Sequence, residues 1–313
     1  MNLLITRRLP PSVITAARAR FDVTYRDEIT PLTPADLRAA LRDYDAILPT
    51  LGDLFRADTF ADVPQPRAKL LANFGVGTNH IDLAAAHGAG LHVTNTPGAV
   101  TDATADIALT LILMSARRAS EGERLLRAGN WHGWHPTQLL GSQVTGKTIG
   151  IIGMGRIGQA IARRCHHGFA MQVIFHNRAP LPHDFARQTS LSETLQADFV
   201  VLAVPATPQT RHLINAATLS QMRPTAHLIN IARGDVVDEP ALIAALQSRQ
   251  IAGAGLDVYE FEPEIPAALT ALDNVTLLPH LGTAALEVRE AMGMMALANL
   301  MAYLDGKTLP NPV

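Results

Sequence analysis

Three short stretches in the C-terminal half of the chain carry residue types suited to acid–base chemistry and anion binding. Each reads as an apolar strand that runs into polar residues: INIARGDVVDE (229–239), LDVYEFEPEIP (256–266) and LLPHLGTAA (277–285). Their reactive side chains are Arg233, Glu260, Glu262, Glu264 and His280. Ligands of open α/β sheets bind beyond the carboxyl ends of the strands, so an arginine, a glutamate and a histidine can converge there. Taken singly, each also has a structural explanation: a turn cap, a surface acid and a structural histidine.

A glycine-rich turn indicates a second function, the binding of a dinucleotide. GIIGMGRIGQAIARR (150–164) carries Gly153, Gly155 and Gly158 in G-x-G-x-x-G spacing, between an apolar strand and a helix. The first glycine permits the tight turn, the second lets the backbone approach a pyrophosphate, and the third lets helix and strand touch. The alternative is an ordinary glycine turn, but the flanking strand and helix favour the cofactor.

The helix after this turn offers free N–H groups and the positive end of its dipole to phosphates, with Arg156 and Ile157 supplying amides. The next strand ends in His176, Asn177 and Arg178, where an NAD site usually has an acid. Asn177 does not repel a 2′-phosphate and Arg178 can grip one, so the pair predicts NADP in preference to NAD. If Arg178 is merely solvated, the site accepts either cofactor.

The elements that must position these residues alternate between strand and helix. In the first half, helices are expected at 11–21 and from Thr33, an N-cap followed by Pro34. The expected strands are NLLIT (2–6), AILPT (46–50), KLLANF (69–74) and LHVTN (91–95). Short apolar strands alternating with helices predict an α/β fold with buried, mostly parallel strands.

In the second half, a long helix is expected from Thr101 to Arg127, because apolar residues recur at three- and four-residue spacing. The segment after it, GNWHGWHPTQLLGSQVTG, is rich in turn formers and is predicted to leave the core. A second strand series then leads to a final apolar helix from Ala284 to about Tyr303. Its strands are KTIGIIG (147–153), VIFHN (173–177), FVVLAV (199–204), AHLINIA (226–232), GAGLDVY (253–259) and VTLLPH (275–280).

The composition bounds the class of protein. A chain of 313 residues with 48% hydrophobic and 17% charged residues can bury large cores, and its length makes two domains the expectation. A net charge of −2 without a basic block argues against nucleic acid as a partner. The single cysteine, Cys165, excludes an internal disulfide and fits a reducing cytosol. No apolar run suits a signal peptide or a membrane span, so a cytoplasmic protein without a membrane partner is expected.

Over nearly its whole length the chain resembles the D-isomer-specific 2-hydroxyacid dehydrogenases, and most closely their glyoxylate/hydroxypyruvate reductase branch. The motifs that carry the resemblance are GIIGMGRIGQAIA, VPATPQTRHLIN (204–215), NIARGDVVDEPALIAAL (230–246), GLDVYEFEP (255–263) and LLPHLGTAA. The resemblance implies two Rossmann-like α/β domains with parallel sheets and an active-site cleft between them. The substrate-binding domain would be split, at 1–97 plus 284–313. The NAD(P)-binding domain would span 98–283 and include a dimerisation helix and arm.

The family's catalytic residues match Arg233, Glu262 and His280. Arg233 would bind the substrate carboxylate and polarise the 2-keto oxygen. His280 would give a proton to that oxygen during hydride transfer, and would act as the base in oxidation. Glu262 would orient His280 and stabilise its charged form. Glu260 and Glu264 are the alternatives for the glutamate.

The resemblance also implies residues that contact the substrate. In the stretch NFGVGTNHIDLAAA, the backbone of Val76 and Gly77 would bind the carboxylate. Leu51 and Gly52 match a stretch that lines the family's pocket. Trp134, in WHGWH, would reach the active site of the other subunit of a homodimer, or else anchor the interface.

Further cofactor contacts follow from the same matches. Asp257 would bond the nicotinamide carboxamide, and in an otherwise apolar strand it needs either a ligand or a buried hydrogen bond. The other implied cofactor contacts are Thr101, Pro205, Thr210, Ile231 and Gly282.

The sequence thus predicts an NADPH-preferring reductase of small 2-keto acids, with glyoxylate and hydroxypyruvate as the leading substrates; larger 2-keto acids stay open. One alternative is a non-enzymatic NAD(P) sensor of the same fold, although the chain has no long tail or basic patch for a partner. Another is a dehydrogenase with a different donor, such as formate or phosphite. His132 and His135 are spaced like metal ligands, but no acid or cysteine is nearby, so no metal site is predicted.

Overall fold

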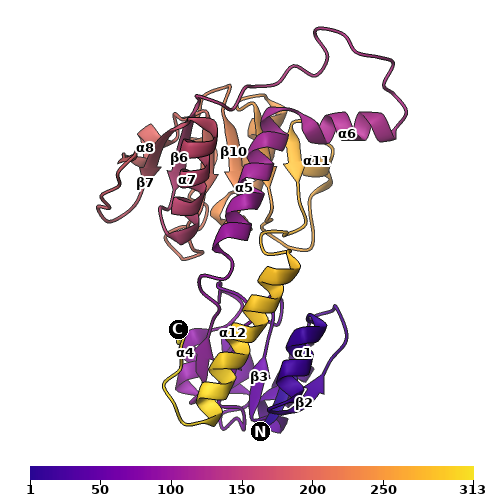
Figure 1. Cartoon of the computed structure of the whole chain (residues 1–313), viewed down its shortest axis with the longest axis vertical. Coiled ribbons are helices and arrows are strands. Elements are labelled where there is room, and N and C mark those ends of the chain that lie inside the picture. Colours follow the sequence, from indigo (N-terminus) through magenta and orange to yellow (C-terminus); the bar gives the residue numbers. More distant parts are fainter. The chain divides into compact units, whose positions relative to one another are not determined.

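The computed structural model describes all 313 residues of the chain. The chain divides into two compact units (Figure 1). Unit 1 comprises Met1–Val100 and Thr283–Val313, and unit 2 comprises Thr101–Gly282. Each unit contains one sheet whose strand pairs are all parallel, with helices joining the strands, so the predicted α/β class with Rossmann-like units is confirmed.

The sheet of unit 1 has the order β2-β1-β3-β4-β5. Its strands are β1 (Asn2–Ile5), β2 (Asp22–Tyr25), β3 (Ala46–Leu48), β4 (Leu70–Ala72) and β5 (His92–Thr94). The helices of this unit are α1 (Pro11–Arg18), α2 (Pro34–Asp43), α3 (Ala57–Ala61), α4 (Leu83–Gly88) and α12 (Leu286–Leu304). As predicted, Thr33 caps α2: its hydroxyl accepts from the N–H of Asp36, whose carboxylate accepts from the N–H of Thr33.

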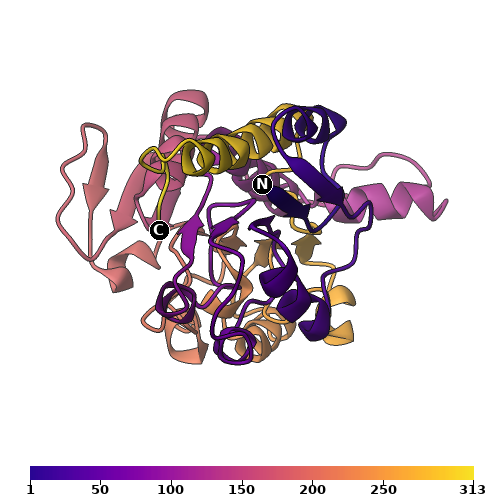
Figure 2. The ribbon, with the colours of Figure 1, turned by 90° about the horizontal axis from the view of Figure 1, so that it is seen from below.

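The helices of unit 1 bury both faces of its sheet. One apolar cluster joins α2, α3 and α4 to alternate residues of the strands, among them Leu4, Ile47 and Leu71. Elsewhere in this unit α12 lies beside α1 (Figure 2). A Cβ at Gly293 would lie 2.4 Å from a methyl group of Val13, so the two helices approach as closely as a glycine allows. The C-terminal helix thereby joins the N-terminal part of the chain in one unit.

The sheet of unit 2 has the order β12-β11-β10-β9-β6-β7-β8. Its strands are β6 (Thr148–Ile152), β7 (Gln172–His176), β8 (Ala186–Gln188), β9 (Phe199–Leu202), β10 (His227–Asn230), β11 (Gly253–Leu256) and β12 (Val275–Leu277). The helices are α5 (Thr101–Ala116), α6 (Ala119–Arg127), α7 (Arg156–Phe169), α8 (Leu191–Thr194), α9 (Ala216–Leu219), α10 (Glu239–Gln247) and α11 (Ala267–Thr270), with a short 3₁₀ helix at Gly234–Val236. The order turns back at β6, next to β9, and this is the switch point at which such sheets bind ligands.

Two apolar clusters cover the faces of this sheet. One joins α5 and α7 to residues such as Ile151 and Val201, and the other joins α10 and the short helices to residues such as Val200 and Leu202. The alternation between Val200, Val201 and Leu202 shows that β9 is buried on both sides, which explains its unbroken apolar sequence.

The predicted long helix from Thr101 to Arg127 is wrong, because the structure has two helices there. Arg118 adopts a left-handed conformation with φ of 51° between α5 and α6. In a continuous helix the carbonyl of Ala116 would accept from the N–H of Ser120. In the structure this carbonyl instead accepts from the N–H of Ser142, at 2.8 Å, in the segment that leads from α6 to β6. The break therefore depends on a contact with a residue distant in the sequence.

Other differences concern strand ends and edges. The strands end up to three residues before the predicted ends, so Thr50, Phe74 and His280 lie in the connections that follow. The edge strands β2 and β8 were not predicted, because half-exposed polar edge strands lack an apolar run. No helix has the length and apolar character needed to cross a membrane.

Candidate active site

The glycine-rich turn joins β6 to α7 in the shape that a phosphate site requires. Gly153 has φ of +98°, and a Cβ there would lie 2.7 Å from the carbonyl oxygen of Ala203. A Cβ at Gly158 would lie 2.2 Å from the carbonyl oxygen of Gly153. Gly155, by contrast, has no atom within 4 Å of a Cβ position, so the backbone there is open to a ligand.

The start of α7 leaves its N–H groups available. Gly155 is the N-cap, and no side chain caps the helix. The first N–H groups of a helix have no partner within it, and they attract anions together with the helix dipole. Arg156 and Ile157, predicted to supply amides, are the first two residues of this helix. The turn therefore fits the pyrophosphate of a dinucleotide.

The loop after β7 is tied to the glycine turn. The side-chain oxygen of Asn177 accepts from the N–H of Met154 at 2.8 Å. Gln188, on β8, donates to the carbonyl oxygens of Asn177 and Ala179, both at 3.0 Å. This side chain was not recognised in the sequence, because its role depends on an edge strand that was not predicted. Arg178 lies exposed within the loop so held.

The other predicted cofactor residues are distributed over the same unit. The hydroxyl of Thr210 donates to the carbonyl oxygen of Pro205 at 2.7 Å, so these two residues are neighbours. Thr101 is the first residue of α5, and Ile231 is buried directly after β10.

Asp257 follows β11 and is almost fully buried. Its carboxylate accepts from the N–H of Leu281 at 2.6 Å and from the N–H of Gly282 at 2.8 Å. Burial raises the pKa of Asp257, against these two hydrogen bonds and the charge of His280. The buried partner expected from the sequence is therefore the backbone just after His280, and Asp257 fixes the course of that segment.

The histidine and one glutamate form a direct pair. Nδ1 of His280 lies 2.8 Å from Oε2 of Glu262, and each side chain is 31% exposed. The other carboxylate oxygen of Glu262 accepts from the N–H of Tyr259 at 2.9 Å. With Nδ1 engaged by the carboxylate, Nε2 is the ring nitrogen left to exchange a proton with a ligand.

Electrostatics join Arg233 to this pair. Burial opposes ionisation of Glu262, but the hydrogen bond and charge of His280, the Tyr259 N–H and the charge of Arg233 together lower the pKa of Glu262. Burial lowers the pKa of Arg233, against the charges of Glu262 and Asp235. The glutamate is therefore the counter-ion that the histidine and arginine share.

Close packing of backbone places Arg233 beside the glutamate loop. A Cβ at Gly234 would lie 1.8 Å from the carbonyl carbon of Tyr259, so the chain after β10 touches the chain after β11. The other two candidate glutamates differ from Glu262. Glu260 is engaged by His212 at 2.7 Å and by Arg211 at 3.4 Å, whereas the carboxylate of Glu264 has no hydrogen bond or ion pair. Glu262 is the one that contacts His280.

In unit 1, the loop after β4 is shaped by asparagines. Asn73 donates to the carbonyl oxygens of Gly75 at 3.1 Å and Gly77 at 3.0 Å, and its own oxygen lies 3.0 Å from Nε2 of His80. Asn95 donates to the carbonyl oxygen of Val76 at 2.9 Å. These bonds engage the carbonyl groups of Gly75, Val76 and Gly77 and fix the shape of the loop. The sequence signal that could have identified Asn73 is its place as a polar side chain at the end of the apolar stretch KLLANF.

The remaining predicted residues lie on exposed segments. Leu51 and Gly52 follow β3, and Leu51 is partly exposed. Trp134 is 78% exposed in the chain after α6, which projects from the rest of unit 2 in Figure 1. His132 and His135 lie in the same segment, and no group of three acidic, histidine or cysteine residues suited to a metal occurs in the structure.

The glycine-rich turn from Gly153 to Gly158 forms a glycine cradle. Parallel α/β units with such a cradle and an arginine–glutamate–histidine group define a nicotinamide-dependent oxidoreductase. The model of the D-isomer specific 2-hydroxyacid dehydrogenase family, NAD binding domain, matches residues 109–282. The glyoxylate reductase of Thermococcus onnurineus is 43% identical over 321 residues, covering 100% of this chain and 95% of that protein. The chain belongs to the D-isomer specific 2-hydroxyacid dehydrogenase family.

Solved structures agree. The TT0316 protein from Thermus thermophilus superposes with a TM-score of 0.93 at 41% identity, covering 100% of both chains. The NADPH-dependent glyoxylate/hydroxypyruvate reductase of Sinorhizobium meliloti, in complex with NADP and malonate, has a TM-score of 0.89 at 34% identity and covers 100% of this chain and 96% of that one.

Proposed function

We propose that this protein is an NADPH-preferring reductase of small 2-keto acids, chiefly glyoxylate and hydroxypyruvate, and forms D-2-hydroxy acids where the product is chiral. The observation that carries the proposal is the 2.8 Å contact between His280 and Glu262, with Arg233 in electrostatic contact. The names of the relatives support the substrate class, since both the Thermococcus onnurineus and the Sinorhizobium meliloti proteins are glyoxylate reductases.

In this proposal, Arg233 binds the substrate carboxylate and polarises the adjacent keto oxygen. Reduced nicotinamide, when bound at the glycine cradle, supplies the hydride for C2. His280 gives the proton of Nε2 to the keto oxygen, so the product leaves as a hydroxy acid and the histidine is neutral afterwards. In oxidation His280 takes the proton back.

Glu262 acts through His280. A carboxylate at 2.8 Å fixes the imidazole orientation and stabilises its protonated form. Because the pKa of Glu262 is lowered, the carboxylate keeps its negative charge at neutral pH. Asp257 keeps the segment that carries His280 in place, and it would also contact the nicotinamide carboxamide.

The preference for NADPH rests on the loop after β7. Arg178 would bind the 2′-phosphate of the cofactor, and Asn177, which has no negative charge, would not repel it. The binding of Asn177 to Met154 leaves its NH₂ group as the end that can donate.

The substrate loop and the assembly complete the proposal. The N–H groups of Val76 and Gly77 would bind the substrate carboxylate, and Leu51 and Gly52 would line its pocket. The exposed apolar side chains of α6 and the following segment would form a homodimer interface to which Trp134 contributes. The buried free thiol of Cys165 fits a reducing compartment, the cytoplasm.

The role of His280 as proton donor is tested with His280→Gln. The matched control is His87→Gln, a substitution of an exposed histidine. We expect kcat for glyoxylate reduction to fall about 10²–10⁴-fold in the first variant, because general acid catalysis is lost. The control should behave as the wild type. Similar rates for the two variants would show that His280 is not the proton donor.

The binding of the 2′-phosphate by Arg178 is tested with Arg178→Ala. The control is Arg163→Ala, on the exposed face of α7. The first variant should lose about 10–100-fold in kcat/KM for NADPH and little for NADH, as expected for the loss of a charge-assisted hydrogen bond. If the ratio of kcat/KM for NADPH to kcat/KM for NADH were unchanged, Arg178 would not be the residue that binds the 2′-phosphate.

A further inference from the structure

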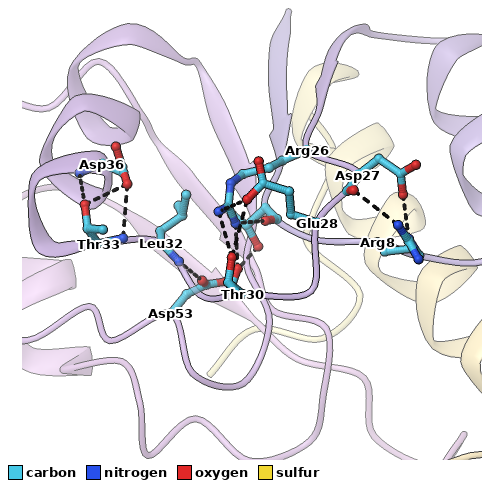
Figure 3. Close-up of polar contacts among 10 residues, drawn as sticks. Arg8, Arg26, Asp27, Glu28, Thr30, Leu32, Thr33, Asp36 and Asp53 are labelled. Atoms are coloured by element: carbon cyan, nitrogen blue, oxygen red, sulfur yellow. Dashed lines mark hydrogen bonds and ion pairs between the residues drawn. The ribbon is translucent and has the colours of Figure 1, made fainter.

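One guanidinium in unit 1 differs from its neighbours. Arg7 follows β1, is half-buried, and its Nε is buried without a hydrogen-bond partner. The adjacent Arg8 pairs with Asp27 at 2.7 Å, and Arg26 binds Glu28 and the carbonyl oxygen of Thr30, as Figure 3 shows. Burying a guanidinium N–H without an acceptor is costly, so this donor of Arg7 needs an explanation.

The buried carboxylate that attracts Arg7, Asp53, does not supply a hydrogen bond to it. Asp53 is fully buried and accepts from the hydroxyl of Thr6 at 2.6 Å, from the N–H of Thr50 at 2.9 Å and from the N–H of Leu32 at 3.0 Å. Figure 3 shows the contact with Leu32. Asp53 attracts Arg7 through its charge, but its oxygens are engaged elsewhere.

The guanidinium lies over the predicted wall of the substrate pocket. A Cβ at Gly52 would lie 2.5 Å from Nη2 of Arg7, and Gly52 has φ of +102°. This φ lies in the region that favours glycine, and a side chain at position 52 would also have to displace the guanidinium of Arg7. Arg7 fills the place that a side chain at position 52 would occupy.

Arg7 and the loop with Val76 and Gly77 both lie beyond the carboxyl ends of strands of one sheet, since Arg7 follows β1 and the loop follows β4. The strand order β1-β3-β4 continues beyond the strand ends: Thr6 N–H donates to Leu48 O at 3.2 Å, and Phe74 N–H donates to Pro49 O at 2.9 Å. Neighbouring strands are about 4.8 Å apart, so the chain after β1 lies roughly 10 Å from the chain after β4. The chain after β3, with Gly52, lies in the middle.

We propose that Arg7 is a specificity-determining residue that binds an oxygen on the distal carbon of the keto acid. This inference rests on the proposed function, in which Val76 and Gly77 hold the carboxylate. With bonds near 1.5 Å, a three-carbon keto acid spans roughly 3.7 Å from its carboxylate carbon to its distal oxygen when extended. That length covers most of one strand spacing, and the side chain of Arg7, which extends over Gly52, covers the rest.

The preferred substrate class is then a 2-keto acid with an oxygen function beyond the keto carbon, such as the hydroxyl of hydroxypyruvate or a second carboxylate. Glyoxylate has no such group. A substrate with an apolar tail, such as phenylpyruvate, would bury Arg7 against hydrocarbon without a partner, which disfavours it.

The test compares Arg7→Met with Arg8→Met, which removes the neighbouring exposed charge. We expect the ratio of kcat/KM for hydroxypyruvate to kcat/KM for glyoxylate to fall about 10–100-fold in Arg7→Met, as when a hydrogen bond to a charged group is lost. Arg8→Met should keep the wild-type ratio. Oxaloacetate, as a third substrate, distinguishes a carboxylate from a hydroxyl as the group that Arg7 binds. If kcat/KM falls more for oxaloacetate in Arg7→Met, the preferred group is a carboxylate. If it falls more for hydroxypyruvate, the preferred group is a hydroxyl.

An unchanged ratio in folded Arg7→Met, or an equal loss for all three substrates, would overturn the inference. If Arg7→Met does not fold, Arg7→Lys keeps the charge and most of the stem but loses the planar fork, and a smaller fall of the same ratio is expected. A wild-type protein that reduces none of the three acids would refute the proposed function itself, and the inference with it.

Discussion

His280 is held in a backbone conformation that is uncommon for residues other than glycine. Its φ is +55°, in the left-handed region, where a residue with a side chain carries a strain of order 1 kcal/mol. Its N–H donates to the carbonyl oxygen of Asp257 at 2.9 Å, and the carboxylate of Asp257 holds the next two N–H groups. This backbone geometry directs the ring towards Glu262. Strain held by neighbouring hydrogen bonds is characteristic of functional positions.

Glu262 places a negative charge beside the ring of His280. Glu262→Gln keeps a hydrogen-bond acceptor for His280 but removes the negative charge that stabilises the protonated ring. We expect kcat for glyoxylate reduction at neutral pH to fall about 10–100-fold, because the charge-assisted hydrogen bond to His280 is lost. Steady-state rates at saturating glyoxylate and NADPH measure the effect. A kcat equal to that of the wild type would contradict the electrostatic role. Glu264→Gln, an exposed neighbour, is the control.

At the scale of elements, the junction between β6 and α7 combines a close contact with an open surface. Gly158 lets the helix touch the turn, whereas Gly168, near the other end of α7, has no atom within 4 Å of its Cβ position. The same substitution at these two positions of one helix therefore separates packing from helix propensity.

Gly158→Ala should weaken NADPH binding by more than tenfold and lower the free energy of unfolding by about 1–3 kcal/mol, because the new methyl group meets the carbonyl of Gly153. Gly168→Ala should keep the affinity and add up to about 1 kcal/mol of stability. Titration of NADPH fluorescence and urea unfolding give the two quantities. Equal affinities in the two variants would disprove the proposed cradle.

A second contact between elements joins α5 to β10. The hydroxyl of Ser115 lies 2.8 Å from Nδ1 of the buried His227, whose ring stacks on Phe199. Burial lowers the pKa of His227 from 6.5 to about 4. The folded protein thus keeps this histidine neutral over a range in which the unfolded chain takes up a proton.

This lowered pKa predicts a loss of stability in acid. Because the folded value lies below the unfolded value, the contribution is fully present above about pH 6.5 and falls as the pH drops towards 4. The full loss amounts to roughly 3 kcal/mol, at about 1.4 kcal/mol per unit. Urea midpoints of wild type and His227→Phe, measured across this pH range, quantify it. The variant should show the shallower decline, and parallel curves would contradict the assignment.

At the scale of the whole molecule, unit 2 exposes an apolar surface. No residue of α6 is buried, and large apolar side chains are exposed on it and on the following segment: Leu126, Trp131, Trp134 and Leu140. Such a surface on a monomer usually marks an interface. A two-fold dimer would bury it symmetrically.

Light scattering should therefore give about twice the chain mass of 33.6 kDa. The double variant Leu126→Ser, Trp131→Ser should shift the equilibrium towards the monomer. Ile29→Ser, which changes a still more exposed apolar residue of unit 1, should not. A monomeric wild type at micromolar concentration would contradict the interface.

Much of the architecture follows from local patterns. The apolar runs around Ile151 and Val200 predict buried parallel strands, and the glycine spacing after β6 predicts the cradle. What the sequence does not reveal depends on contacts between distant residues. The helix break at Arg118 depends on Ser142, the loop holding Arg178 depends on Gln188, and the lack of a partner for the Arg7 Nε is visible only once Asp53 is seen to bind elsewhere.

We propose that this chain reduces small 2-keto acids with NADPH. Initial rates with NADPH and NADH, each against glyoxylate, hydroxypyruvate, pyruvate and phenylpyruvate, are the first test of this proposal. We expect the highest kcat/KM for NADPH with hydroxypyruvate or glyoxylate, and the lowest for phenylpyruvate. An advantage for NADH would contradict the assignment of Asn177 and Arg178. No turnover with any pair, despite cofactor binding, would contradict the reductase and leave a cofactor sensor or a different donor.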